Sequence, residues 1–167
     1  MLEQYRELFA SIRKSPLLYL PRADYPSVVA FLEGCDQGNA RTLLTGFREW
    51  LVTRIGCGNN LVWWSLAAHL TEPVGPKNFL ELEPELDALA VDGLCQLLDE
   101  FLALRQEPDG LARIYAAYHE WTQARHREGC RASGKPTCPM VPWPQPANPL
   151  PEPALDVLQA KEVATAP

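Results

Sequence analysis

Hydrophobic residues recur at helical spacing along most of the chain up to about residue 129. In the first such segment, apolar residues three or four positions apart form one stripe with charged residues opposite, which is typical of a half-buried helix. The stripe consists of Leu2, Tyr5, Leu8, Phe9 and Ile12. Ser15 should end this helix, because a residue before proline, here Pro16, is pushed out of the helical region. Residues 17–21 are then expected to form a short extended apolar connector.

Two further helices are expected between residues 25 and 55. The second begins near Tyr25, with Asp24 or Tyr25 near the cap and Pro26 in the first turn, where the missing proline N–H costs nothing. Gly38 is its expected end. The third helix is predicted over about residues 40 to 55.

The remaining helices follow a glycine- and asparagine-rich loop at 56–60, whose residues tolerate positive φ. Residues 61–70 are apolar on nearly every face, which predicts the central helix. The pattern indicates a long helix from Glu83 to Arg105, and Asp109 is expected to cap a sixth helix. Its inward-facing residues are expected to be Leu111, Ile114, Tyr115, Tyr118 and Trp121.

No segment shows the apolar–polar alternation of a strand, so the sequence predicts an all-α fold, a single-domain bundle of five or six helices. Nine of the sixteen prolines lie between Pro136 and Pro167, and such a segment cannot form a helix or an interior strand. We therefore divide the chain into a helical domain at 1–130 and a proline-rich C-terminal tail at 131–167. The tail is expected to pack on the domain through Val141, Trp143 and Leu150.

Charge is unevenly distributed along the chain. Between Glu72 and Asp109 there are ten acidic residues and only two basic ones, Lys77 and Arg105, while the flanking stretches nearly cancel. Such a band attracts cationic surfaces and repels nucleic acid and anionic membranes. Within it, almost no lysine or arginine lies one helical turn from an acid, where it would relieve repulsion. The band is either a solvated helix face or a surface that a basic partner neutralises.

The candidate partner-binding residues are the acids of this band together with one tryptophan of the apolar helix before it. Trp63 and Trp64 point about 100° apart on a helix, so Trp63 is expected in the core, whereas Trp64 could pack there or reach a partner. The candidates are Glu81, Glu83, Glu85, Asp87, Asp92, Asp99, Glu100 and Trp64.

No catalytic, cofactor or metal site is predicted. His119 and His126 are two helical turns apart, farther than the pair that shares one metal on a zincin helix, and their spacing to Cys130 and Cys138 matches no zinc motif. Cys57 lies between two glycines near Arg54, but no histidine is placed by the sequence to act as its base.

The five cysteines are expected to be reduced thiols, with Cys35 and Cys95 buried on helices. The N-terminus has no basic and apolar leader, and no apolar run reaches the ~20 residues of a membrane span. We therefore expect a cytoplasmic protein.

Four short segments resemble a pattern in small bacterial proteins of the immunity type, which are encoded beside polymorphic or contact-delivered toxins. The segments span roughly residues 12–64 and are Arg13-Lys14-Ser15-Pro16-Leu17-Leu18-Tyr19-Leu20, Phe31-Leu32-x-Gly34, Leu43-Leu44-x-Gly46-Phe47-x-x-Trp50-Leu51 and Gly58-Asn59-Asn60-Leu61-x-Trp63. Pro21 stands where that pattern often has a glycine. The shared residues are mainly of core type, so no functional residue is carried over.

The resemblance implies a protein that neutralises a cognate bacterial toxin by covering its active site, with no chemistry of its own. An acidic surface would suit a toxin that acts on nucleic acids or nucleotides, because such toxins present basic clefts. The alternative is a non-catalytic helical adaptor that binds a cellular partner through the proline-rich tail. An enzyme would need a pocket of convergent polar groups that the sequence does not reveal.

Overall fold

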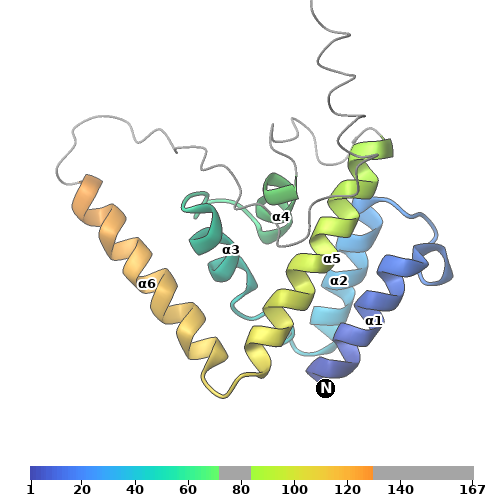
Figure 1. Cartoon of the computed structure of the whole chain (residues 1–167), viewed down its shortest axis with the longest axis horizontal. Helices are drawn as coiled ribbons and strands as arrows, with labels where there is room; N and C mark the ends of the chain where they lie inside the picture. The colour runs from blue at the N-terminus through green and yellow to red at the C-terminus, as the bar shows by residue number, and fades with distance from the viewer. Residues whose placement is uncertain (72–83, 130–167) are drawn as a thin grey trace, which may run out of the picture.

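The computed structural model describes residues 1–71 and 84–129, and this part of the chain contains helices and no strand (Figure 1). The elements are α1 (Leu2–Lys14), a short 3-10 helix η1 (Pro16–Leu18), α2 (Tyr25–Gly38), α3 (Phe47–Ile55), α4 (Trp63–Thr71), α5 (Pro84–Gln106) and α6 (Gly110–Gly129). The all-α prediction is confirmed for this part. The proline-rich tail and its expected packing lie outside the described residues, and the domain division stays a prediction.

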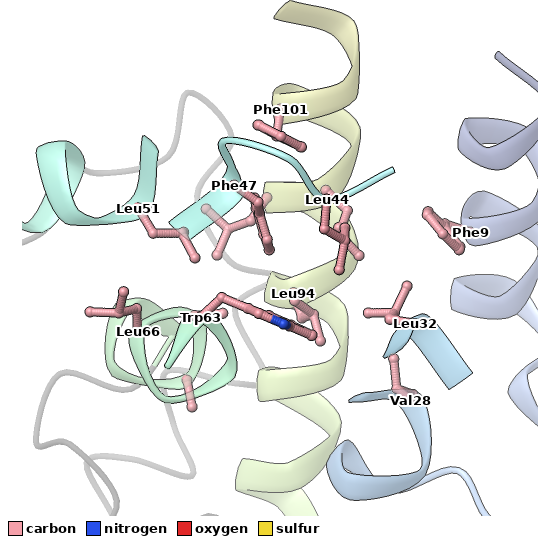
Figure 2. Close-up of a cluster of buried hydrophobic side chains, with 14 of the residues drawn as sticks. Phe9, Val28, Leu32, Leu44, Phe47, Leu51, Trp63, Leu66, Leu94 and Phe101 are labelled. Atoms are coloured by element: carbon pink, nitrogen blue, oxygen red, sulfur yellow. The ribbon is translucent and has the colours of Figure 1, made fainter. Parts of the chain in front are cut away.

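Helix α5 is the centre of the core. It contacts α1, α2, α4 and α6, and its side chains Leu94 and Phe101 are fully buried. Figure 2 shows side chains of α3 and α4 on one side of α5 and those of α1 and α2 on the other. The prediction that residues 61–70 form the central helix is therefore wrong. That segment supplies the nine-residue α4, whereas α5 is 23 residues long and contacts α1, α2, α4 and α6.

The beginning of α2 follows its local sequence. The Asp24 carboxylate accepts a hydrogen bond from the Ser27 amide at 2.9 Å and so satisfies one of the amides that a helix start leaves without an internal partner. Pro26 occupies the first turn, and the helix ends at Gly38 as expected. Both ends of α2 could therefore be read from the residues themselves.

Helix α3 begins at Phe47, seven residues later than predicted. The intervening chain turns through two left-handed residues that are not glycine, Ala40 with φ 51° and Arg41 with φ 59°, and through Gly46 with φ 87°. A helix cannot pass through such residues, because the left-handed conformation reverses its backbone twist. The predicted start near residue 40 is wrong for this reason.

Two charged side chains hold this loop in place. Asp36, which is buried near the end of α2, accepts a hydrogen bond from the Leu44 amide at 2.9 Å. Arg105 of α5 donates through Nη1 to the carbonyl oxygens of Thr42 and Leu43 at 2.8 and 2.6 Å. The loop's polar groups are thus satisfied from two other parts of the chain, which offsets the strain of its left-handed residues.

Helix α5 is continuous through Gly93. A Cβ at this position would lie 2.2 Å from Cγ2 of Thr71, the last residue of α4. The glycine therefore permits close packing of α4 on α5. Among the described residues, no helix combines the length and the apolar run needed to cross a membrane.

Candidate partner-binding surface

Two of the candidate acids on α5 are paired with arginines of α1. Asp99 accepts from Nε of Arg6 at 2.8 Å. Asp92 is held by both nitrogens of the Arg13 fork, Nε and Nη2, the latter at 3.0 Å from Oδ2. These bonds dominate the raised pKa values of both guanidinium groups. The earlier residue of α1, Arg6, faces the later residue of α5, Asp99, and Arg13 faces Asp92. Helices α1 and α5 are therefore antiparallel.

A third candidate acid is paired on the other side of α5. Glu100 accepts a hydrogen bond from Arg54 of α3, whose guanidinium also lies 4.5 Å from the centre of the Trp50 ring. The cations that relieve repulsion along α5 are therefore supplied by α1 and α3. The two pairs on α1 and the one on α3 each tie a neighbouring helix to the central one.

The first turns of α5 are arranged differently. Asp87 accepts a hydrogen bond from the backbone amide of Tyr25 at 2.9 Å, and the buried Tyr25 hydroxyl donates to the carbonyl oxygen of Trp64 at 2.6 Å. Tyr25 thus contacts two candidates that are far apart in sequence, Asp87 through its backbone amide and the Trp64 backbone through its hydroxyl. The half-buried Trp64 ring stands edge-on to Trp63, with ring centres 5.6 Å apart. Trp63 itself is in the core, as predicted.

Acidic charge gathers at this end of α5. Asp87 lies near Asp24, whose charge helps to raise the pKa of Asp87; burial is the main cause of that shift, and the Tyr25 amide opposes it. Glu85, on the first turn, is exposed. Arg22 is the basic residue of this group and pairs with Asp24 at 2.6 Å. We call Asp24, Glu85 and Asp87 the acidic end of α5. Glu81 and Glu83 lie outside the described residues.

The candidates therefore do not form a single patch. Residues 85 and 99 on one helix are about 21 Å apart at 1.5 Å per residue. Asp92 and Asp99 face α1, Glu100 faces α3, and Glu85 and Asp87 lie at the beginning of α5 beside α2. The structure separates residues held by arginines from a small acidic group at one end.

The structure also exposes apolar residues that the sequence pattern does not single out as surface. Leu17 and Leu18 are 69% and 80% exposed, and Tyr19 is 44% exposed. They belong to η1 and the residue that follows it, so the predicted extended connector is wrong. On α6, Tyr115 was expected to face inward but is exposed, whereas Ile114 is buried. A turn that interrupts the helical period gives no sign of which way its apolar residues point.

The two histidines of α6 line an open hollow of about 380 Å³ together with Thr122 and Gln123. His119 Nε2 lies 2.8 Å from the Gln123 amide nitrogen. Within the described ranges, no three or more histidine, cysteine, aspartate or glutamate side chains are grouped to hold a metal ion.

The described cysteines differ in state. Cys95 is buried and Cys35 is half-buried, both are free thiols, and burial raises both pKa values, that of Cys95 to about 11. Neither is therefore an activated nucleophile. Cys57 is disulfide-bonded. The expectation that all cysteines are reduced is wrong for Cys57.

Comparison of the chain with protein-family models, with curated proteins and with solved structures finds no match.

Proposed function

We propose that this chain is a non-catalytic protein inhibitor of the immunity type, which neutralises a cognate bacterial toxin by occluding a basic active-site cleft. The observation that carries the proposal is the acidic end of α5, where Asp87 lies close to Asp24 and its partner Arg22, and the exposed Glu85 stands two residues before Asp87 on the same helix. Elsewhere along α5 the acids are compensated by arginines of neighbouring helices. Among the described acids of α5, Glu85 and Asp87 are therefore the ones that no ion pair holds against a neighbouring helix.

The acidic end is also held rigidly. Asp24 caps α2, Asp87 accepts from the first amide of the same helix, and the buried Tyr25 ties both to the α4 backbone. A charged group that is already fixed loses little conformational freedom on binding, so its attraction for a basic cleft is not consumed by ordering. We assign the contact role to Glu85 and Asp87, with Trp64 beside them.

The other candidate acids have a different role in this proposal. Asp92, Asp99 and Glu100 hold α1 and α3 against α5, so their substitution should affect the fold before it affects a partner. Occlusion requires no general acid, nucleophile or cofactor from the inhibitor. Its partner is a protein toxin, and neither nucleic acid nor membrane is a partner in this account, because the acidic end repels both.

The proposal is tested by stoichiometry. The cognate toxin domain required by the proposal is expressed with and without this chain, and the purified toxin is titrated with the full chain. We expect protection from growth arrest and a linear loss of toxin activity that reaches its floor near one equivalent. Failure to protect would contradict occlusion. Complete inhibition by far less than one equivalent of the chain would also contradict it, because each molecule would then have inactivated several toxin molecules.

A truncated chain separates the adaptor alternative. If removal of residues 139–167 abolishes partner binding while the helical body keeps its circular dichroism spectrum, binding resides in the tail and the inhibitor proposal fails. Full binding by the truncated chain places the contact on the helical body.

A further inference from the structure

The turn after α1 presents apolar side chains that the core does not use. Leu17 and Leu18 are 69% and 80% exposed, whereas nearly all the other leucines of the described residues are buried or half-buried, and Tyr19 is 44% exposed. We call these three residues the Leu17–Tyr19 knob. Two adjacent leucines that stand out to this extent leave a contiguous apolar surface in water, which is typical of a binding site.

The knob is fixed in shape. Its backbone is closed by hydrogen bonds from the amides of Leu18 and Tyr19 to the carbonyl oxygens of Ser15 and Pro16, at 3.1 and 3.0 Å. The chain is anchored on both sides, because Ile12 before the knob and Leu20 after it are buried. The backbone that carries the leucines is therefore preorganised, which lowers the ordering cost of an anchor that fills a pocket.

The knob and the acidic end of α5 lie on the same side of the molecule. Helices α1 and α5 are antiparallel, so the end of α1, from which the knob projects, approaches the beginning of α5. Figure 1 shows α1 ending alongside the middle of α5, from where the connector that carries η1 runs on to the beginning of α2 near the first turns of α5. Arg22, three residues after Tyr19, pairs with Asp24, and its positive charge is close enough to Asp87 to oppose the rise in the pKa of that carboxyl. One partner could thus touch both features.

The size of the knob argues against a second copy of this chain. Three residues that are only partly exposed offer far less than the ~800 Å² per partner that a stable interface buries. Two knobs in contact would also bring two acidic ends together, and like charges across an interface are unfavourable. The knob therefore suits the apolar part of a larger contact that includes the acidic end.

The charges around the knob also argue against a lipid surface. Lys14 and Arg22 lie before and after it and would favour anionic headgroups, but Arg22 is already paired with Asp24. Glu85 and Asp87 lie nearby, and the whole chain carries a net charge of −6, so anionic lipid would be repelled. A basic protein surface satisfies both the acidic end and the knob.

We propose that the Leu17–Tyr19 knob inserts into an apolar pocket on the partner, and that basic residues of the partner beside this pocket meet the acidic end of α5. This inference rests on the proposed function for the identity of the partner, a protein toxin, but the knob's role holds for any basic protein partner. The leucines supply affinity and the acids supply orientation and association rate.

The experiment maps the contact by photo-cross-linking in cells of the organism from which the protein comes, using the full chain with p-benzoylphenylalanine at position 18, 85 or 107. Position 107 is an exposed glutamate that directly follows the opposite end of α5, and it is the control. We expect positions 18 and 85, but not 107, to cross-link to one protein. Peptide mapping should place both attachment points on one basic domain of the partner. The residues around the attachment point of position 18 should be apolar.

Affinity measurements with that purified partner complete the test. The double variant Leu17→Ser/Leu18→Ser should weaken binding roughly 10- to 100-fold for each leucine that becomes buried in the complex. The matched control is Leu61→Ser/Val62→Ser, an apolar pair 41% and 43% exposed before α4, which should bind as the parent chain does. Unchanged melting temperatures for both variants would show that the lost affinity is not lost folding.

Several outcomes would overturn the knob's role: cross-links from position 18 only to lipid, to a second copy or to residues 139–167 of the same chain, or none at all. Unchanged affinity in the Leu17/Leu18 variant would do the same. If positions 18 and 85 capture a partner that does not arrest growth when expressed alone, the toxin-inhibitor proposal fails and the knob inference stands. If a toxin is captured from position 85 alone, the inhibitor proposal stands and the knob inference fails.

Discussion

The pairing of Asp92 with Arg13 gives a prediction that can be worked from the structure. Both nitrogens of the guanidinium fork contact the carboxylate, and Gln96 also donates to Oδ2 at 2.7 Å, so the carboxylate is well oriented. The side chains are 39% and 42% exposed, so solvent screens the attraction strongly. We expect a coupling free energy of about 0.5–1 kcal/mol, at the upper end for surface pairs because the contact is two-pronged.

A double-mutant cycle measures this coupling. Four proteins are compared by urea unfolding: the parent chain, Arg13→Met, Asp92→Ala and the double variant. Methionine preserves the packing of the arginine stem on its neighbours. The coupling should shrink in 1 M salt, where charges are screened within about 3 Å. A coupling of zero, or one that salt does not change, would refute the conclusion that α1 compensates the charge of α5.

Three further predictions concern the core, the loop and pH. Phe101→Ala should lower the free energy of unfolding by about 3–5 kcal/mol in urea unfolding, because its fully buried ring packs against Phe47 with centres 4.8 Å apart. Ala40→Gly should raise it by about 0.5–1 kcal/mol, because the exposed Ala40 holds a left-handed φ of 51° that glycine adopts without strain; a loss of stability would contradict this. Burial raises the pKa of Asp87, so the native state binds this proton more readily than the unfolded state, and the associated stability is lost as pH rises through the raised pKa. In Asp87→Asn, stability measured against pH should lack this fall, while the bond from the Tyr25 amide can be kept by the asparagine oxygen.

Much of the fold could be predicted because its signals are local. The cap at Asp24, the proline in the first turn of α2 and the break at Ser15 act through neighbouring residues, and the structure confirms them. The start of α3 could not be predicted in this way. Its preceding loop holds left-handed residues that are supported by Asp36 and by Arg105, the latter more than sixty residues away.

The candidate surface shows a similar limit. A search for cations one turn away on the same helix finds almost none for the acids of α5, yet Arg6 lies 93 residues from Asp99 and Arg54 lies 46 residues from Glu100. The exposed Leu17 was missed for the converse reason. An apolar residue is assigned to the interior by default, and only the packing of the described helices against one another shows that Leu17 lies outside their core.

The most direct test of the account is the salt dependence of association between this chain and its toxin, measured by stopped-flow fluorescence for the parent, Glu85→Lys and Glu120→Lys. Both variants change one exposed acid to a base, Glu85 at the acidic end of α5 and Glu120 on α6. The account predicts that Glu85→Lys slows association several-fold at low salt and that the difference fades as salt rises, while Glu120→Lys associates as the parent does. Equal rates for all three proteins, or equal slowing by both variants, would contradict the claim that the acidic end of α5 meets the partner.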